Sequence, residues 1–411
     1  MKRVVITGMG IISPLGNDLD TFWGNLVEGK SGISTIDTLD VSNSKTKIAG
    51  VVRNLDPEGR WGQKEARRLD RFAQFALAAA EQALEASQLK LEKIDRERFG
   101  VYVGSGIGGI QTFVDNVNLL NERGPGRVSP NLVPMMISNA AAAQISIKLG
   151  AHGPSLSPVT ACSIGNTAIG EAFNTIRYGD ADVIFAGGTE AAITNLSLAS
   201  FGNAKALSTR NEEPSLASRP FDANRDGFVM SEGAGILVLE SLEHAVQRNA
   251  PILCEVIGYG ASSDAHHMVA THPEGKGAYL AMRNALLKAN LAIDEIDVIS
   301  AHATSTQVGD FSETMAIKRL FGDYAYKIPV TANKSMLGHM LGAAGGAEAI
   351  ALVKSLQEGI VPSTINLENP DPACDLDYVT EGARRIPLSI GISNSFGFGG
   401  HNSAIVLKRF E

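Results

Sequence analysis

Short apolar runs alternate with amphipathic stretches along almost the whole chain. Between the apolar runs, alanine and phenylalanine recur at helical spacing at 66–86, 278–290 and 345–357. Runs of strand length, many of them ending in glycine, occur at 3–8, 101–104, 182–187, 235–240, 254–258, 298–300, 328–331 and 403–407. Strands that alternate with helices predict an α/β fold with a mostly parallel sheet covered by helices on both faces.

A four-residue sequence occurs twice. Pro-Val-Thr-Ala stands at 158–161, before Cys162, and again at 329–332, before Asn333. A helical pattern rich in small residues follows each copy. This shared strand–turn–helix form predicts a duplicated fold, with halves at residues 1–250 and 251–411.

Composition narrows the class of protein. The 411 residues are 44% hydrophobic, enough for a large core, and the formal net charge of −8 disfavours non-specific nucleic-acid binding. Three cysteines without a Cys-x-x-Cys pair argue against a disulfide framework and a structural zinc site. No stretch resembles a signal peptide or a bilayer span, so we expect a soluble, cytoplasmic protein.

Cys162 is the first candidate for chemistry. It follows the first Pro-Val-Thr-Ala copy and precedes a helix, so it should lie at a helix N-terminus among small neighbours. The free N–H groups there would lower the pKa of the thiol and stabilise an oxyanion once the sulfur attacks a carbonyl. The alternative is a buried, unreactive cysteine, the assignment we give Cys254 and Cys374.

Two histidine segments add polar groups. His302 follows an apolar strand and is surrounded by small and hydroxylated residues. His339 should begin a glycine- and alanine-rich helix, whose dipole would keep the imidazole neutral. Lys334 is expected either to be buried and paired with an acid, for which Glu313 is the candidate, or to be a solvated surface lysine. No helical His-x-x-x-His spacing supports a metal site.

Glycine-rich segments occur at 104–109 and 393–402. The first lacks the spacing of a dinucleotide-binding loop. The second carries Phe396 and Phe398 on a pliable backbone, which predicts either a gate or a hairpin with an apolar plug.

Together these segments resemble the β-ketoacyl–carrier-protein synthases, and most closely the type II elongating enzymes of this condensing-enzyme family. The resemblance covers the whole chain. It rests on the motifs at 4–10, 104–109, 159–163 and 219–230, on the segments at His302 and at 334–339, and on the motif at 394–400, which stand in family order. The family implies a thiolase-type fold with two duplicated halves in five layers (α-β-α-β-α), a homodimer, and acyl carrier protein as partner.

The resemblance also implies residue roles. Cys162 would carry the acyl chain, His302 and His339 would stabilise an enolate, and Phe228 would assist decarboxylation. The remaining roles fall to an oxyanion-hole amide at Phe398, a polar network of Lys334, Glu313 and Glu348, and substrate contacts from Ile107, Phe201, Thr304, Thr306, Phe396 and Gly399. No cofactor or catalytic metal is required, although some members bind a monovalent cation, here near Glu348, Ser393 and Asn394.

Four positions depart from the commonest family pattern. They are Ala303, Asn333, His401 and Val269, and they leave the chain-length and saturation preference open.

An acidic carrier protein needs a basic landing site. Lys64, Arg67 and Arg68 should share one helical turn, and Lys205 would add to them. The alternative is an ordinary solvated helix.

Other functions remain open. A thiolase would need a second cysteine at 393–402, which is absent, and a non-catalytic chain-length partner would lack Cys162. A polyketide or secondary-lipid ketosynthase with the same chemistry is not distinguished.

Overall fold

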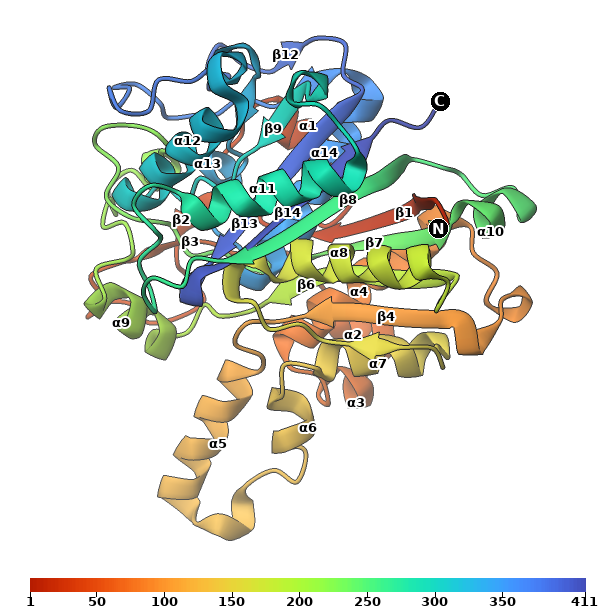
Figure 1. Cartoon of the computed structure of the whole chain (residues 1–411). Helices are drawn as coiled ribbons and strands as arrows, with labels where there is room; N and C mark the ends of the chain where they lie inside the picture. The colour runs from red at the N-terminus through yellow and green to blue at the C-terminus, as the bar shows by residue number, and fades with distance from the viewer.

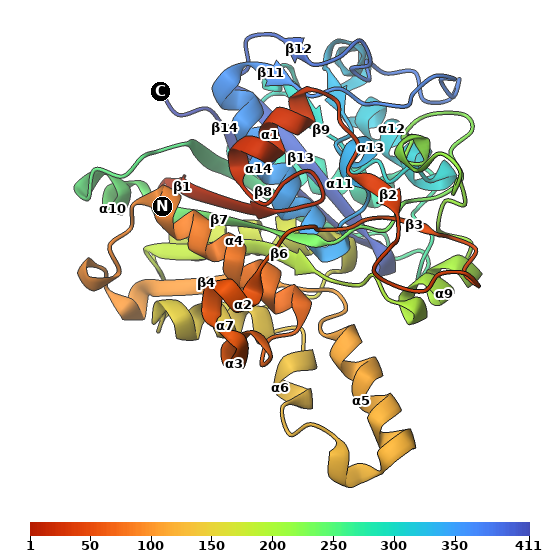
Figure 2. The same ribbon diagram turned by 180° about the vertical axis from the view of Figure 1, so that it is seen from behind.

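The computed structural model describes residues 1–411 as one α/β body with a protruding helical arm (Figures 1 and 2). Its strands are β1 (Val4–Ile12), β2 (Ile33–Thr35), β3 (Ile48–Gly50), β4 (Phe99–Gly104), β5 (Ser155–Leu156), β6 (Val183–Glu190), β7 (Gly233–Ser241), β8 (Cys254–Ser263), β9 (Val298–Ser300), β10 (Val330–Thr331), β11 (Ile360–Val361), β12 (Arg384–Arg385), β13 (Ile390–Gly397) and β14 (His401–Lys408).

The helices cover and connect these strands. They are α1 (Leu19–Val27), α2 (Pro57–Trp61), α3 (Gln63–Ala66), α4 (Arg71–Ser87), α5 (Ile110–Arg123), α6 (Leu132–Met136), α7 (Ala140–Leu149), α8 (Ile164–Tyr178), α9 (Asn195–Asn203), α10 (Leu242–Gln247), α11 (Lys276–Ala289), α12 (Gln307–Phe321), α13 (Lys334–Leu337) and α14 (Ala344–Glu358). None of them combines the length and apolar character that crossing a membrane requires.

Ten strands form one sheet, in the order β10-β9-β13-β14-β8-β1-β7-β6-β4-β5. The two halves of this sheet repeat one topology. From the centre outward, the strand order is β1-β7-β6-β4-β5 in the first half and β8-β14-β13-β9-β10 in the second. When only the strands of this sheet are counted, each half therefore has its first strand innermost, followed by its fifth, fourth, second and third. A short antiparallel pairing of β1 with β8 joins the halves. This repetition confirms the duplicated fold that the Pro-Val-Thr-Ala echo predicts.

The strand directions agree only in part with the prediction of a mostly parallel sheet. In each half four strands run the same way, but the last strand, β7 or β14, is antiparallel to both neighbours. β13 and β14 form a hairpin through the glycine turn at 397–400, and this allows the reversal. Residues 393–397, which we expected in a loop, therefore belong to β13.

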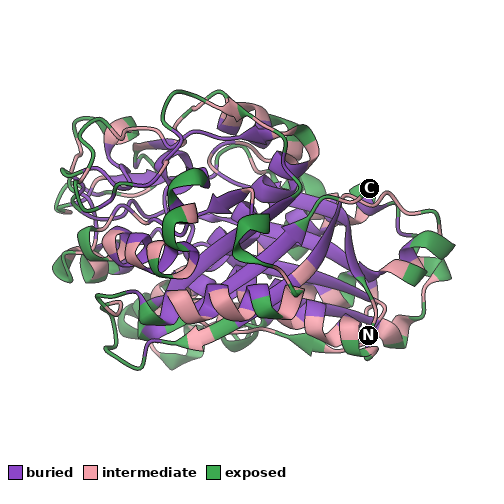
Figure 3. Ribbon diagram, turned by 45° about the horizontal axis from the view of Figure 1, so that its top comes forward, coloured by how far each residue is buried: buried purple, intermediate pink, exposed green.

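The layers follow from which helices pack on which strands. α4 and α7 cover the outer face of the first half-sheet, and α11 covers that of the second. α12 packs beside α11 and shares a core cluster with β9, β13 and β14. α8 and α14 pack against each other between the two half-sheets, and their apolar side chains lie in the largest core cluster. The result is the expected five-layered thiolase-type arrangement, with buried strands inside (Figure 3).

Helix starts deviate from the sequence pattern at one functionally relevant place. The helix predicted over 66–86 begins only at Arg71, because the Asp70 side chain accepts a hydrogen bond from the Phe72 N–H and caps it. Residues 57–66 form the short helices α2 and α3 instead.

Candidate functional site

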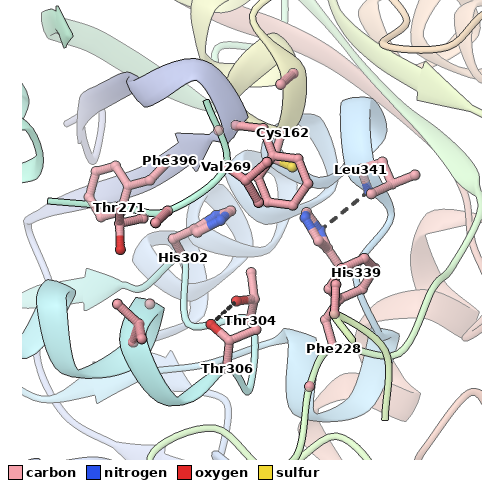
Figure 4. Close-up of a pocket in the computed structure, with 18 of the residues that line it drawn as sticks. Cys162, Phe228, Val269, Thr271, His302, Thr304, Thr306, His339, Leu341 and Phe396 are labelled. Carbon is pink, nitrogen blue, oxygen red and sulfur yellow. Dashed lines mark hydrogen bonds between the residues drawn. The ribbon is translucent and has the colours of Figure 1, made fainter. Parts of the chain in front are cut away.

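A pocket of about 700 Å³ opens where the two halves meet, beside the turns that precede α8 and α14. Its wall includes Cys162 and Phe228 from the first half, and His302, His339 and Phe398 from the second. Figure 4 shows the Cys162 sulfur and the two imidazoles directed toward the same space. The structure thus brings together the three residues that the sequence singled out for chemistry.

Cys162 lies in a 3₁₀ turn, Ala161–Ser163, that leads directly into α8. The preceding Ala161 has a left-handed φ of +50°, a conformation that costs energy for a residue with a Cβ. The backbone of Gly397 closes over this turn: a Cβ there would lie 2.6 Å from the Thr160 carbonyl oxygen and 3.0 Å from the Cys162 nitrogen. Glycine is required at 397 so that the β13–β14 turn can approach the nucleophile.

The electrostatics of the thiol differ from the sequence prediction. Burial raises the pKa of Cys162 to about 11, while the charge of Lys334 and the N–H groups of Phe398 and Cys162 lower it. The expected contribution of backbone N–H groups is therefore present, but removal of water from the thiol outweighs it. These two N–H groups are the ones that the resemblance implies for an oxyanion hole.

His302 and His339 face each other across the pocket. Their ring centroids are 5.5 Å apart and the rings are nearly perpendicular, at 86°. The Leu341 N–H donates to His339 Nδ1 over 3.3 Å, so the proton of a neutral ring lies on Nε2. Burial and the charge of Lys334 lower the pKa of both imidazoles well below its usual value.

The cause of the neutral His339 is not the predicted one. His339 lies between α13 and a 3₁₀ turn, Leu341–Ala343, and α14 begins only at Ala344. It is therefore burial and the nearby lysine, rather than a helix N-terminus at His339 itself, that disfavour the imidazolium.

Aromatic rings line the pocket continuously. The Phe228 ring lies edge-on to the His339 ring, with 5.3 Å between the ring centroids. The centroids of the Phe396 and His302 rings are 5.6 Å apart. The Phe201 ring centroid lies 5.5 Å from that of Phe228 and 6.3 Å from that of Phe398. These rings extend the apolar wall toward the surface. Phe398 is 38% exposed, as a gating side chain would be.

The partner of Lys334 is Glu348, not Glu313. Lys334 and Glu348 form an ion pair whose side chains are only 2% and 1% exposed. Glu313 instead accepts hydrogen bonds from the backbone N–H groups of His302 and Ala303 and from the Asn394 amide, at 2.8–3.0 Å. Glu313 thus holds the His302 segment, while α14 supplies the counter-ion of the lysine.

The predicted substrate contacts divide into two groups. Ile107, Phe201, Thr304, Thr306 and Phe396 all line the pocket. Gly399 does not line it. Its N–H donates to the Met268 carbonyl oxygen and holds the glycine turn against the neighbouring loop.

The predicted basic patch is exposed but not on a single helix. Lys64 belongs to α3, whereas Arg67 and Arg68 lie in the turn before α4. Arg67 Nε lies 3.9 Å from Glu58 Oε1, and both side chains are largely exposed to solvent. Lys205 lies apart from these residues, on the wall of the pocket.

Three buried oxygens on the neighbouring elements α14 and β13 have no hydrogen-bond partner. They are Glu348 Oε2, Ser393 Oγ and Asn394 Oδ1, the residues that the resemblance assigns to a monovalent cation. Buried oxygen atoms require a partner, and a hard cation or a water molecule would satisfy them. The donor atoms of these residues therefore fit such an ion.

Two buried acids near the site were not singled out from the sequence. Glu190 is the last residue of β6 and lines the pocket. Asp310, on α12, accepts a hydrogen bond from the backbone N–H of Ser305. The only sequence signal was a carboxylate directly after an apolar glycine-containing strand, and two acids three residues apart on one helix, Asp310 and Glu313.

Comparison with known proteins gives the family. The model of the beta-ketoacyl synthase N-terminal domain matches residues 1–245, and that of the C-terminal domain matches residues 253–368. The 3-oxoacyl-[acyl-carrier-protein] synthase 2 of Synechocystis sp. is 47% identical over 410 residues, covering 100% of this chain and 99% of the relative. The protein of the same name from Staphylococcus aureus is 48% identical with the same coverage.

Solved structures agree in fold over the full length. A type II polyketide ketosynthase bound to a hexaketide and its acyl carrier protein superimposes with a TM-score of 0.93 at 36% identity, and each chain is covered completely. A beta-ketoacyl synthase from Burkholderia phymatum gives a TM-score of 0.93 at 35% identity, again over both full chains. The chain therefore belongs to the beta-ketoacyl synthase family.

Proposed function

We propose that this protein is a 3-oxoacyl-[acyl-carrier-protein] synthase of the type II elongating class, acting in fatty acid biosynthesis. The observation that carries the proposal is a cysteine in a mainly apolar pocket that faces two imidazoles, whose pKa values are lowered by burial and by the charge of Lys334. A full-length identity of 47–48% to relatives named 3-oxoacyl-[acyl-carrier-protein] synthase 2 supports the same reaction.

The first half-reaction is acyl transfer. The Cys162 sulfur attacks the thioester carbonyl of an acyl carrier protein, and the N–H groups of Cys162 and Phe398 stabilise the tetrahedral oxyanion. The carrier thiol leaves with the proton of Cys162, and the acyl chain remains on the enzyme. The aromatic wall around Phe201 and Phe398 receives the chain.

The second half-reaction forms the carbon–carbon bond. The bond between the malonyl carboxylate and its α-carbon breaks, CO2 leaves, and the electron pair becomes an enolate whose oxygen accepts hydrogen bonds from His302 and His339. Because Leu341 fixes the His339 proton on Nε2, a neutral ring donates without first losing a proton. The enolate carbon then attacks the acyl thioester, Cys162 leaves, and one proton is taken up overall. Phe228, packed edge-on against His339, keeps water from this step.

Several further properties belong to the same proposal. We infer a homodimer, a cytoplasmic location, docking of acyl carrier protein through Lys64, Arg67, Arg68 and Lys205, and a division of the chain at residue 250. The acidic character of carrier proteins and the exposure of these four side chains support the docking site.

The test is product mass spectrometry with malonyl carrier protein and a ladder of acyl carrier proteins. The wild type should yield a β-ketoacyl product two carbons longer, together with an acyl adduct on Cys162, and the Cys162→Ala variant should yield neither. If the wild type gives neither signal with any of the acyl carrier proteins tested, the proposal is rejected.

A second candidate is a polyketide ketosynthase with the same chemistry. It is favoured by the full-length likeness to the type II polyketide enzyme at 36% identity. Repeated condensation on one carrier, giving a poly-β-ketone instead of a single extension, would identify it in the same assay.

A further inference from the structure

Glu190, the last residue of β6, has a fully buried carboxylate with four donors. It accepts hydrogen bonds from Ser105 Oγ at 2.7 Å, Gly106 N at 2.9 Å, Ile107 N at 3.2 Å and Gly342 N at 3.1 Å. The carboxylate lies on the pocket wall, yet none of the steps above uses it. An ionised carboxylate accepts only, and with two oxygens it can satisfy all four donors.

Three of the donors belong to the loop that carries Ile107. Ser105 Oγ donates to Glu190 and also accepts from the Gly108 N–H at 2.9 Å, so the loop is tied down at both ends. Ile107 is 37% exposed and lines the pocket. The position of its side chain therefore depends on the Glu190 carboxylate.

The fourth donor belongs to the turn that orients His339. Gly342 follows Leu341, whose N–H donates to His339 Nδ1 (Figure 4). The two loops meet over the carboxylate, since a Cβ on Gly342 would lie 2.9 Å from Glu190 Oε2 and 3.1 Å from the Gly106 nitrogen. Movement of either loop must be transmitted to this shared acceptor.

We propose that Glu190 is a positioning residue that couples the Ile107 loop to the His339 turn, so that one carboxylate sets both acyl-chain preference and enolate stabilisation. The proposal rests on the proposed function. Replacement by glutamine would keep the size but place an NH2 group against backbone N–H donors, which would push at least one loop away.

The experiment compares Glu190→Gln with a matched control. Glu240→Gln also alters a buried carboxylate, but the partners of Glu240 are Thr7, His244 and Arg248, away from the pocket. Two rates are measured: Cys162 acylation by short- and long-chain acyl carrier proteins, by intact mass, and CO2 release from malonyl carrier protein. We expect Glu190→Gln to lower CO2 release about tenfold to a hundredfold and to change the ratio of long- to short-chain acylation, because small misplacements have effects of this size. Glu240→Gln should preserve that ratio.

Equal slowing of all rates in both variants, or no change in Glu190→Gln, would overturn the proposal. If Glu190→Gln does not fold, Glu190→Asp is compared with Glu240→Gln in the same way. The aspartate keeps the negative charge, but its shorter side chain moves the carboxylate away from the two loops. Hydrogen exchange of residues 105–108 and 341–342 gives a readout that needs no activity: both segments should exchange faster in the Glu190 variant only. This readout stands even if the wild type forms no β-ketoacyl product, so failure of the coupling and failure of the proposed function are distinguishable.

Discussion

The Cys162 thiol experiences two opposing influences: backbone N–H groups that favour the thiolate and burial that favours the thiol. Burial dominates and raises the pKa to about 11. Because a raised pKa preserves the neutral thiol, alkylation by iodoacetamide should keep accelerating from about pH 7 to pH 10 instead of levelling off near the usual thiol pKa of about 8.5. Intact mass, corrected with Cys162→Ala, measures this rate. A plateau below about pH 8 would show that the N–H groups prevail.

At the scale of elements, the α13 residue Lys334 and the α14 residue Glu348 join two helices through a buried ion pair. Lys334→Met leaves a buried carboxylate without a partner and should lower the free energy of unfolding by about 3–5 kcal/mol in chemical denaturation. The double variant Lys334→Met/Glu348→Gln should lose much less, because no charge is left unpaired. Equal losses in the two would contradict this.

The same double variant has a pH signature. The Lys334 charge lowers the pKa of both imidazoles, so its removal should raise these pKa values. Imidazolium would then form at higher pH, and CO2 release should fall off at a higher pH on the acid side than in the wild type.

The short helices α2 and α3 and the turn that follows them carry the exposed basic side chains. Reversal of Arg67 and Arg68 to Glu should raise KM for carrier-bound substrate severalfold, since rim charges mainly steer association, and should spare a small acyl thioester. Lys90→Glu/Lys93→Glu, an equally exposed pair, is the control. An unchanged KM for the carrier-bound substrate would reject this surface.

At the scale of the whole molecule, the arm formed by α5 and α6 projects from the body (Figures 1 and 2). α5 exposes Phe113, Val117 and Leu120 at helical spacing, an apolar stripe that water disfavours. We expect light scattering to give twice the 43.4 kDa of one chain. Phe113→Glu/Leu120→Glu should shift the mass toward the monomer, whereas Asn118→Glu on the same helix should not. A monomeric wild type would contradict the dimer.

Local sequence determined much of this protein. The eight strand-length runs each overlap an observed strand, and α11 and α14 begin within two residues of their predicted starts, because periodicity along the chain reports which faces are buried. The strand expected at 158–161 does not form, since the strand before Cys162, β5, ends at Leu156. Cys162, His302 and His339 were also recognisable, since small and hydroxylated residues around each predict a pocket. Their catalytic roles remain predictions.

Only the tertiary structure decided which groups meet. Lys334 could pair with Glu313 or Glu348, and spacing along the chain does not say which carboxylate the fold brings near. The pKa of Cys162 depends on how deeply the thiol is buried. Glu190 accepts hydrogen bonds from Gly106 and Gly342, which are far apart in sequence and meet only in the folded chain. Hydrophobic periodicity specifies elements, but contacts between distant residues, and the loss of water that accompanies them, are properties of the packed chain.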